Sequence, residues 1–259
     1  MTAVLRRINV VGIAAMFSVL VLWELSVRTG LVTFEYIPPP TRVVAGLGEI
    51  ISSGELTTNL VHTLTAAVVG WAIACVVGVL AGLALGLSRA TWTYSMASVD
   101  ALRALPIVAF VPVAVLLLGF TMEMEIVVAF YAALWPIVLN TVAGLRSVEV
   151  RLLEVGRVLR LGHRGVLWKL RLPAATPFII VGMRLGLSVS LVLTLVSEMV
   201  GNPAGLGFAL LQKAQSLQPE QMFAYIVVIG VAGIVLNAVL MALARLLFPG
   251  QMAASGESA

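Results

Sequence analysis

Two histidines and one cysteine are the first side chains to consider for catalytic or metal chemistry. His62 and His163 belong to neither an H-E-x-x-H nor a G-x-S-x-G pattern with a histidine partner, which are typical of zinc and serine hydrolases. Cys75 is the single cysteine and lies in an apolar run, so neither a disulfide framework nor a Cys/His metal cluster is available. We expect an interfacial histidine, a surface histidine and a packing cysteine, and no enzymatic chemistry in this chain.

Charged and polar residues inside long apolar runs form a second group. Arg184 and Glu198 share one run, and because a charge in hydrocarbon is expensive, both are expected to face the interior of a helix bundle. Arg184 could contact a solute directly or only pair with a nearby carboxylate or carbonyl. Prolines in another run could kink a packing helix or free carbonyls that line a pathway. The candidate pathway residues are Pro106, Pro112, Asn140, Arg184, Ser188, Thr194 and Glu198.

The composition indicates the environment that holds these residues. Of the 259 residues, 61% are hydrophobic and 11% are charged, whereas about 25% of an ordinary soluble domain is charged. The mean hydropathy is +1.08. A soluble domain of this size has more surface than so few polar residues can cover. The chain is therefore expected to be a membrane protein.

Long apolar runs divide the chain into about six candidate membrane spans, since about 20 apolar residues cross the hydrocarbon layer. They cover approximately residues 10–28, 62–88, 96–119, 124–144, 176–199 and 222–247. Backbone in lipid must satisfy its own hydrogen bonds, and runs this long suit helices rather than barrel strands. The predicted fold class is all-α, a polytopic membrane protein with a single transmembrane domain over residues 1–259.

The distribution of charge predicts the orientation of the spans, because cytoplasmic loops are rich in Lys and Arg. With the N-terminus inside, the cations in or beside cytoplasmic segments are Arg6, Arg7, Arg89, Arg146, Arg151, Arg157, Arg160, Arg164, Lys169, Arg171 and Arg245. The acidic residues then expected outside are Glu35, Glu49, Glu55, Glu123, Glu125 and Glu220. Both termini are expected in the cytoplasm, and the net charge of +4 reflects topology rather than nucleic-acid binding.

The outer loop of residues 29–61 is expected to contain a short amphipathic helix. Pro38 to Pro40 force an extended stretch, after which Thr41 can cap the helix. The apolar side of this helix would include Val44, Leu47 and Ile51.

Small residues recur every four positions in the second predicted span, at Gly70, Ala74, Gly78, Gly82 and Gly86. Residues four apart share one face of a helix, so they form a groove in which another helix backbone can approach closely. We expect a packing seam here rather than a catalytic site.

The segment of residues 146–174 joins the fourth and fifth spans and contains Arg160, Arg164, Lys169 and Arg171. Residues 148–160 place apolar and charged side chains on opposite sides of a short helix. Gly162 would permit a turn into a second short helix, "RGVLWKLRL", that ends at Pro173. Two such helices would present a formed surface to a cytoplasmic partner.

The register of Glu154, Val155 and Gly156, followed by Leu172-Pro173, resembles the EAA loop of ABC importer permeases. "RALPIVAFVPVAVLLLGF" is similar to the Pro-rich third span of the nitrate/sulfonate/taurine branch, and "GMRLGLSVSLVLTLVSEM" resembles another of its spans. "GLG" at 205–207 and "IPPPTRV" also match that branch, so the resemblance covers roughly residues 35–247. Two departures are Arg160, where the family usually has glycine, and Gly156, which replaces the second alanine of the motif.

The resemblance implies a type I ABC importer permease fold with cytoplasmic coupling helices, moving a small, anionic solute such as a sulfonate, nitrate or taurine by alternating access. It implies four kinds of partner in a bacterial inner membrane: an ATP-binding-cassette ATPase dimer, an extracytoplasmic solute-binding protein, a second permease copy, identical or paralogous, and membrane lipids. The ATPase would bind ATP and Mg²⁺, since this chain has no G-x-x-x-x-G-K-[ST] loop and is expected to hold neither cofactor nor metal. The residues implied in coupling are Glu154, Val155, Gly156, Arg157, Arg160, Leu161, Gly162, His163, Leu172 and Pro173.

An ion-coupled secondary transporter or channel is the alternative. Such proteins often contain inverted repeats and acidic residues at the bilayer midplane. The sequence indicates no repeat of that kind and no central carboxylate, which disfavours this class.

Overall fold

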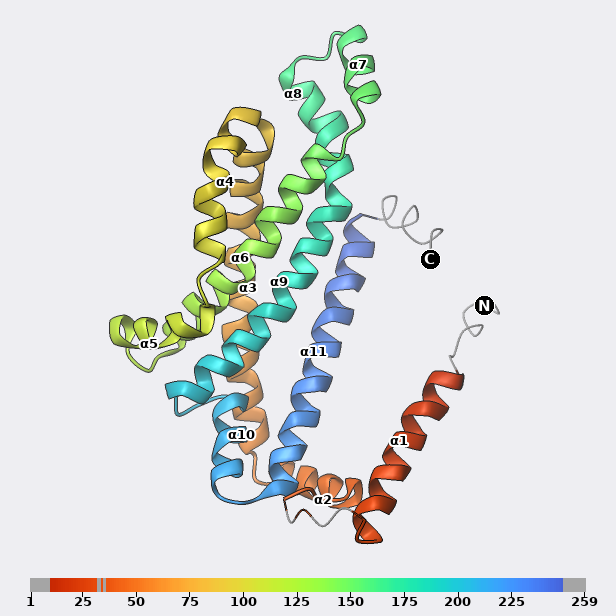
Figure 1. The fold of residues 1–259 in the computed structure, drawn as a ribbon, viewed down its shortest axis with the longest axis vertical. Helices are drawn as coiled ribbons and strands as arrows, with labels where there is room; N and C mark the ends of the chain where they lie inside the picture. Colours follow the sequence, from red (N-terminus) through yellow and green to blue (C-terminus); the bar gives the residue numbers. More distant parts are fainter. Residues whose placement is uncertain (1–9, 32–33, 35, 249–259) are drawn as a thin grey trace. The chain divides into compact units, whose positions relative to one another are not determined.

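The computed structural model describes residues 10–31, 34 and 36–248, and all of its regular elements are helices (Figure 1). Arg6, Arg7 and Glu35, which entered the orientation argument, lie outside the described residues. The elements are α1 (Val10–Arg28), α2 (Pro40–Ser52), α3 (Glu55–Leu87), α4 (Arg89–Arg103), α5 (Ile107–Leu118), α6 (Met122–Arg146), α7 (Val150–Val158), α8 (His163–Val166), the π-helical turn η1 (Leu167–Arg171), α9 (Leu172–Gly201), α10 (Leu206–Gln215) and α11 (Pro219–Leu247). The predicted all-α class is confirmed.

Five of these helices are long and apolar enough to cross a membrane, and a bent pair, α4 with α5, makes up to six. The predicted span over residues 96–119 is sharply bent, because the two helices meet at 78° and form either a broken span or a re-entrant loop. The break lies just before Pro106, whose ring disfavours helical geometry in the preceding residue and which has no N–H to donate. The hydroxyl of Tyr131 on α6 donates to the carbonyl of Leu102 near the break, at 2.7 Å. Pro112, in contrast, lies inside α5.

The chain forms two compact units. The first contains the residues up to 57 together with 209–228, and the second contains residues 58–208 together with those from 229 onward. Most of the predicted functional positions belong to the second unit.

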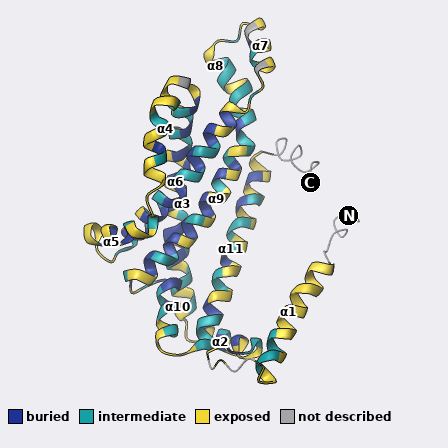
Figure 2. Cartoon of the chain, in the orientation of Figure 1, coloured by how far each residue is buried: buried dark blue, intermediate teal, exposed yellow. Residues whose placement is uncertain are grey.

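The second unit is built on close contact of α3 and α9 with α6, where most buried residues lie (Figure 2). On α3, Gly70, Gly78, Gly82 and Gly86 all face α6, and a Cβ atom at Gly82 would lie 2.5 Å from the Cβ atom of Thr141. Glycines at 182 and 186 bring α9 equally close to α6. Without side chains at these positions the helix backbones approach closely, which is how helices associate in lipid, where no hydrophobic force drives them together.

The first unit contains α1 and α2, and α2 starts differently from the prediction. Thr41 is not the cap: Pro39 is, and Pro40 occupies the first turn, where a missing N–H costs nothing. Glu24 on α1 takes the capping role instead, because Thr41 donates its backbone N–H and its hydroxyl to the Glu24 carboxylate at 3.1 and 2.9 Å. The residues of α2 that pack against the protein are also not those of its predicted apolar side.

The buried positions of α2 are Val43, Gly46 and Ile50, whereas Val44 and Ile51 are exposed. Gly46 explains the choice of face. A Cβ atom at this position would lie 2.7 Å from the Glu220 backbone at the start of α11, so this glycine permits a close approach that the other face does not offer.

Candidate functional site

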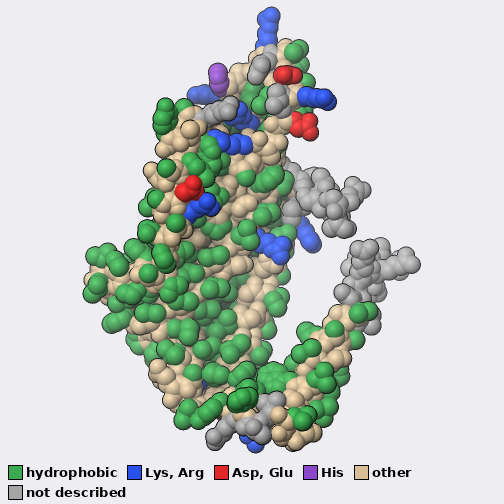
Figure 3. All heavy atoms as spheres, in the orientation of Figure 1, with side chains coloured by type: hydrophobic (Ala, Val, Ile, Leu, Met, Phe, Trp, Pro, Cys, Tyr) green, Lys and Arg blue, Asp and Glu red, His purple; other side chains and the backbone are tan. Residues whose placement is uncertain are grey.

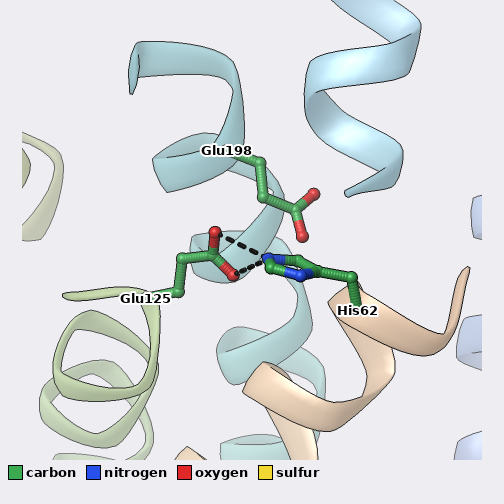
Figure 4. Close-up of side chains that lie close together, drawn as sticks. All are labelled: His62, Glu125 and Glu198. Carbon is green, nitrogen blue, oxygen red and sulfur yellow. Dashed lines mark hydrogen bonds and ion pairs between the residues drawn. The ribbon is translucent and has the colours of Figure 1, made fainter. Parts of the chain in front are cut away.

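A polar cluster is buried in the second unit where the ends of three helices meet (Figure 4). His62 comes from α3, Glu125 from the first turn of α6 and Glu198 from the end of α9. The Nε2 atom of His62 lies 3.1 Å from both carboxylate oxygens of Glu125. Both glutamates are fully buried, and the His62 side chain is 18% exposed. Buried ionisable groups within a membrane bundle mark candidate functional sites.

Glu198 also anchors the segment that connects α9 to α10. Its two oxygens accept hydrogen bonds from the Thr63 hydroxyl at 2.6 Å and from the Gly207 N–H at 2.7 Å. Thr63 in turn accepts a hydrogen bond from the Leu206 N–H at 2.8 Å. The Gly205 N–H donates to Asn59 Oδ1 at 3.1 Å. The backbone of residues 205–207 is therefore attached to α3 and to the last turns of α9.

Sequence reasoning found one member of this cluster and missed the other two. Glu198 lies in the interior, as expected. Glu125 was counted only among the acidic residues expected on the outer side of the membrane, but its carboxylate is buried, contacts His62 and also accepts a hydrogen bond from Asn202. The signal was present, since Glu125 shares helical periodicity with Val128 and Ala132, which lie on the buried face of α6. His62 carried no local signal, because its partner is on another helix.

The remaining predicted pathway residues are dispersed. Arg184 does not face the bundle interior as expected: it is exposed, and its Nε donates to Asn237 Oδ1 of α11 at 2.8 Å. Thr194 is buried and donates to the Ser190 carbonyl, and Asn140 donates to the Pro136 carbonyl. Each of these hydrogen bonds joins two residues of the same helix, α9 for Thr194 and α6 for Asn140, so it indicates a structural role. The other exposed residues of the predicted pathway are Pro106, Pro112 and Ser188.

Ser188 and Asn237 line an open groove of about 260 Å³ between α9 and α11. Its remaining lining residues are small or apolar, among them Leu191, Gly230 and Gly233. Arg184 is hydrogen-bonded to Asn237 and therefore lies beside this groove.

The segment between α6 and α9 carries the predicted coupling residues. Val155 and Val158 on α7 and Trp168 in η1 are strongly exposed, whereas Gly156 is buried, with a Cβ position 3.0 Å from Leu170. Charged side chains gather over α7 and α8 (Figure 3), and His163 is the first residue of α8. The side chain of Arg157 lies outside the described part of the chain. The segment thus combines exposed apolar residues with a charged surround.

A cavity of about 620 Å³ lies beneath this segment, lined by Leu153, Leu161, His163, Arg164 and Arg171 among others. Leu161 and His163, two predicted coupling residues, therefore share one concave surface with two cations.

The turn between α7 and α8 differs from the prediction. Gly162 was expected to supply it, but Gly162 has an extended conformation with φ −64° and starts α8. The left-handed residue is Arg160, with φ 50°. The chain thus keeps the turn at position 160 without the glycine that favours such a conformation.

The second helix of this segment does not end at Pro173, contrary to the prediction. Residues His163–Gly201 form one continuous helical rod of 39 residues that includes Leu172 and Pro173. The reason is the π-helical turn directly before Pro173, in which the Leu172 N–H bonds to the Leu167 carbonyl. This wider turn accommodates a residue that lacks an N–H and would clash with a regular helix.

Several apolar helices around a glycine-lined seam, with an exposed charged segment between two of them, define a multi-pass membrane permease. The chain belongs to the family of binding-protein-dependent transport system inner membrane components, whose model matches residues 74–252. It is the permease subunit of an ABC importer, and the secondary-transporter alternative is not favoured.

The curated relatives include the putative aliphatic sulfonates transport permease protein SsuC of Bacillus subtilis, 31% identical over 83% of this chain and 78% of that protein. The nitrate import permease protein NrtB of Synechocystis is 30% identical over 76% of this chain and 71% of its own length. The taurine transport system permease protein TauC of Escherichia coli is 27% identical over 95% of this chain and 91% of that protein.

Among solved structures, an inward-facing conformation of the MetNI methionine ABC transporter contains a similar chain. The TM-score is 0.57 at 18% identity, over 70% of this chain and 92% of that one. At this identity the likeness shows the fold, and it supports the predicted fold of the importer permease class.

Proposed function

We propose that this chain forms the membrane path for a small oxyanion such as a sulfonate or nitrate. The relatives named above are permeases for aliphatic sulfonates, nitrate and taurine, and all of these solutes carry a negatively charged oxygen group. A cation along the path would complement that group.

The observation that carries this proposal is Arg184. It lies near the middle of the apolar helix α9, far from either end. A charge at such a position is costly, so its presence indicates a functional residue. Its Nε bonds to Asn237, and within the described residues the other guanidinium nitrogens have no acceptor. A guanidinium held at one nitrogen and open at the others can bind an oxyanion through the remaining donors.

The energy would come from an ATP-binding-cassette ATPase dimer that docks on α7 and α8. This assignment rests on the exposed Val155, Val158 and Trp168, because apolar side chains exposed in a charged segment favour an interface. ATP and Mg²⁺ would be bound by that partner, since this sequence has no phosphate-binding loop. The chain would itself be non-catalytic.

The other partners follow from the transport cycle. A solute-binding protein would deliver the anion at the face opposite to α7 and α8, and a second permease copy, identical or paralogous, would complete the path. The basic residues around α8 and η1 support a cytoplasmic location for this end of the second unit under the positive-inside rule. Both termini would then lie in the cytoplasm of a bacterium, with membrane lipids around the apolar helices.

Uptake by the reconstituted complex tests the proposal. Arg184→Gln is expected to raise the KM for sulfonate or nitrate about ten- to hundredfold, the loss of one or two charged hydrogen bonds, while Arg184→Lys loses less. Arg245→Gln, which removes an exposed cation from the last turn of α11, is the matched control. An unchanged KM in Arg184→Gln, with uptake intact, would contradict the proposed role of this residue.

A further inference from the structure

We propose that His62, Glu125 and Glu198 bind one divalent transition-metal ion of the zinc type. The sequence provides no reason to expect a metal, because it has neither a Cys/His cluster nor a metal-binding motif. The structure instead brings one imidazole and two carboxylates together from three helices. The inference does not depend on the transported solute.

The geometry suits a single ion. One ligand atom from each of the three residues lies within 4.8 Å of the others, and His62 Nε2 is 3.1 Å from Glu125. In a tetrahedral site with bonds of about 2.1 Å, two ligand atoms are about 3.4 Å apart. Small side-chain rotations therefore bring the three groups onto one ion.

The charge of the cluster also favours a cation. Within the described residues, neither Glu125 nor Glu198 has an ion pair with Lys or Arg, and His62 is the single basic partner. Ionising both buried carboxylates without a further cation is costly in an apolar bundle. A divalent ion bound by a neutral imidazole and two carboxylates has no net charge.

The hydrogen bonds of the two carboxylates leave lone pairs free for a metal ion. Thr63 and Gly207 each donate to one oxygen of Glu198, and Asn202 donates to Glu125. A metal ion would use the remaining lone pairs, since each carboxylate oxygen has two.

The same donors act as an outer shell that orients the carboxylates, which is typical of protein metal sites. The ligand types select the metal: imidazole nitrogen suits zinc, nickel or cobalt, whereas calcium and magnesium prefer oxygen ligands alone. The partly exposed edge of His62 gives the ion a way in. A bound ion would link the ends of α3, α6 and α9.

The proposal is tested by measuring the metal content of the full-length chain. The chain is purified with its associated subunits through a tag that contains no histidines. After chelation and dialysis against zinc, the wild type is expected to retain about one more equivalent per chain than the His62→Gln variant. Asn202→Ala, which removes an outer-shell donor, is expected to weaken binding about ten- to hundredfold. His163→Gln and Glu220→Gln remove the same side-chain types elsewhere and should bind as the wild type does.

Cobalt substitution distinguishes the loss of a metal site from a failure of the variant to fold. Co²⁺ in the wild type should give the visible ligand-field bands of a tetrahedral site, and His62→Cys should add a thiolate-to-cobalt charge-transfer band. The wild type contains the buried Cys75 and should lack that band, so the band reports position 62. A folded wild type that binds no zinc or cobalt beyond the His62→Gln level would overturn the proposal and leave a proton as the balancing cation.

Discussion

Gly205 lies directly against the carboxylate of Glu198. A Cβ atom at position 205 would be 2.2 Å from Glu198 Cδ, and the backbone of Gly205 is left-handed with φ +95°. Both facts require glycine, because a side chain would displace the carboxylate from Thr63 and Gly207 and would strain the backbone. This contact fixes the segment between α9 and α10 relative to the buried cluster.

Gly205→Ala is therefore expected to destabilise the chain by about 2–4 kcal/mol, the sum of an overpacked contact and a left-handed alanine. The apparent Tm of the detergent-solubilised protein measures the effect. Gly230→Ala is the matched control, because a Cβ atom at Gly230 would meet nothing within 4 Å. Equal losses of Tm in the two variants would show that the Glu198 contact is unimportant.

Removing the carboxylate should loosen the same segment. Glu198→Ala leaves the Thr63 hydroxyl and the Gly207 N–H without their acceptor in a buried site, which costs about 1–3 kcal/mol for each group. Hydrogen–deuterium exchange should therefore accelerate in residues 203–208. Glu198→Gln keeps one acceptor oxygen and should give an intermediate rate. Exchange at the wild-type rate in Glu198→Ala would refute the anchoring role.

The helices were predictable from the sequence, and the buried cluster was predictable only in part. Hydropathy identifies apolar runs and the prolines indicated a kink, but neither predicts the size of the bend before Pro106. Glu125 stands at the start of its run, where a carboxylate resembles a solvent-exposed residue, and only the helical periodicity with Val128 and Ala132 places it inside. The contact of His62 with Glu125 joins residues far apart in the chain, and no local pattern encodes it.

The segment between α6 and α9 shows a related limit of prediction from the sequence. Gly162 was the obvious turn residue, yet Arg160 takes the left-handed conformation. Composition identifies where a turn is easy, but it does not show which residue takes the left-handed conformation.

Position 160 should consequently respond to backbone strain. A left-handed conformation costs a residue with a side chain roughly 1–2 kcal/mol, and a β-branched residue more. Arg160→Gly should slow local hydrogen exchange in residues 155–162 or leave it unchanged, and Arg160→Val should accelerate it about tenfold or more. Gly162→Ala is expected to have no effect, because its φ of −64° suits alanine and a Cβ atom would have open space. Faster exchange in Gly162→Ala than in Arg160→Val would mean that the turn is at Gly162.

The orientation of the chain predicts which positions a membrane-impermeant thiol reagent can reach. Cys75 is buried, so a Cys75→Ser background removes it at little cost and leaves single introduced cysteines as the targets. In intact cells, cysteine at Glu55, an exposed position at the start of α3, should be labelled from outside. Cysteine at position 160 should be labelled only after the membrane is permeabilised, because in the proposed orientation the basic residues that follow it lie in the cytoplasm. The cysteine of Glu55→Cys should then react to the same extent before and after permeabilisation. Labelling of Arg160→Cys in intact cells would reverse the assigned topology and, with it, the side on which an ATPase could dock.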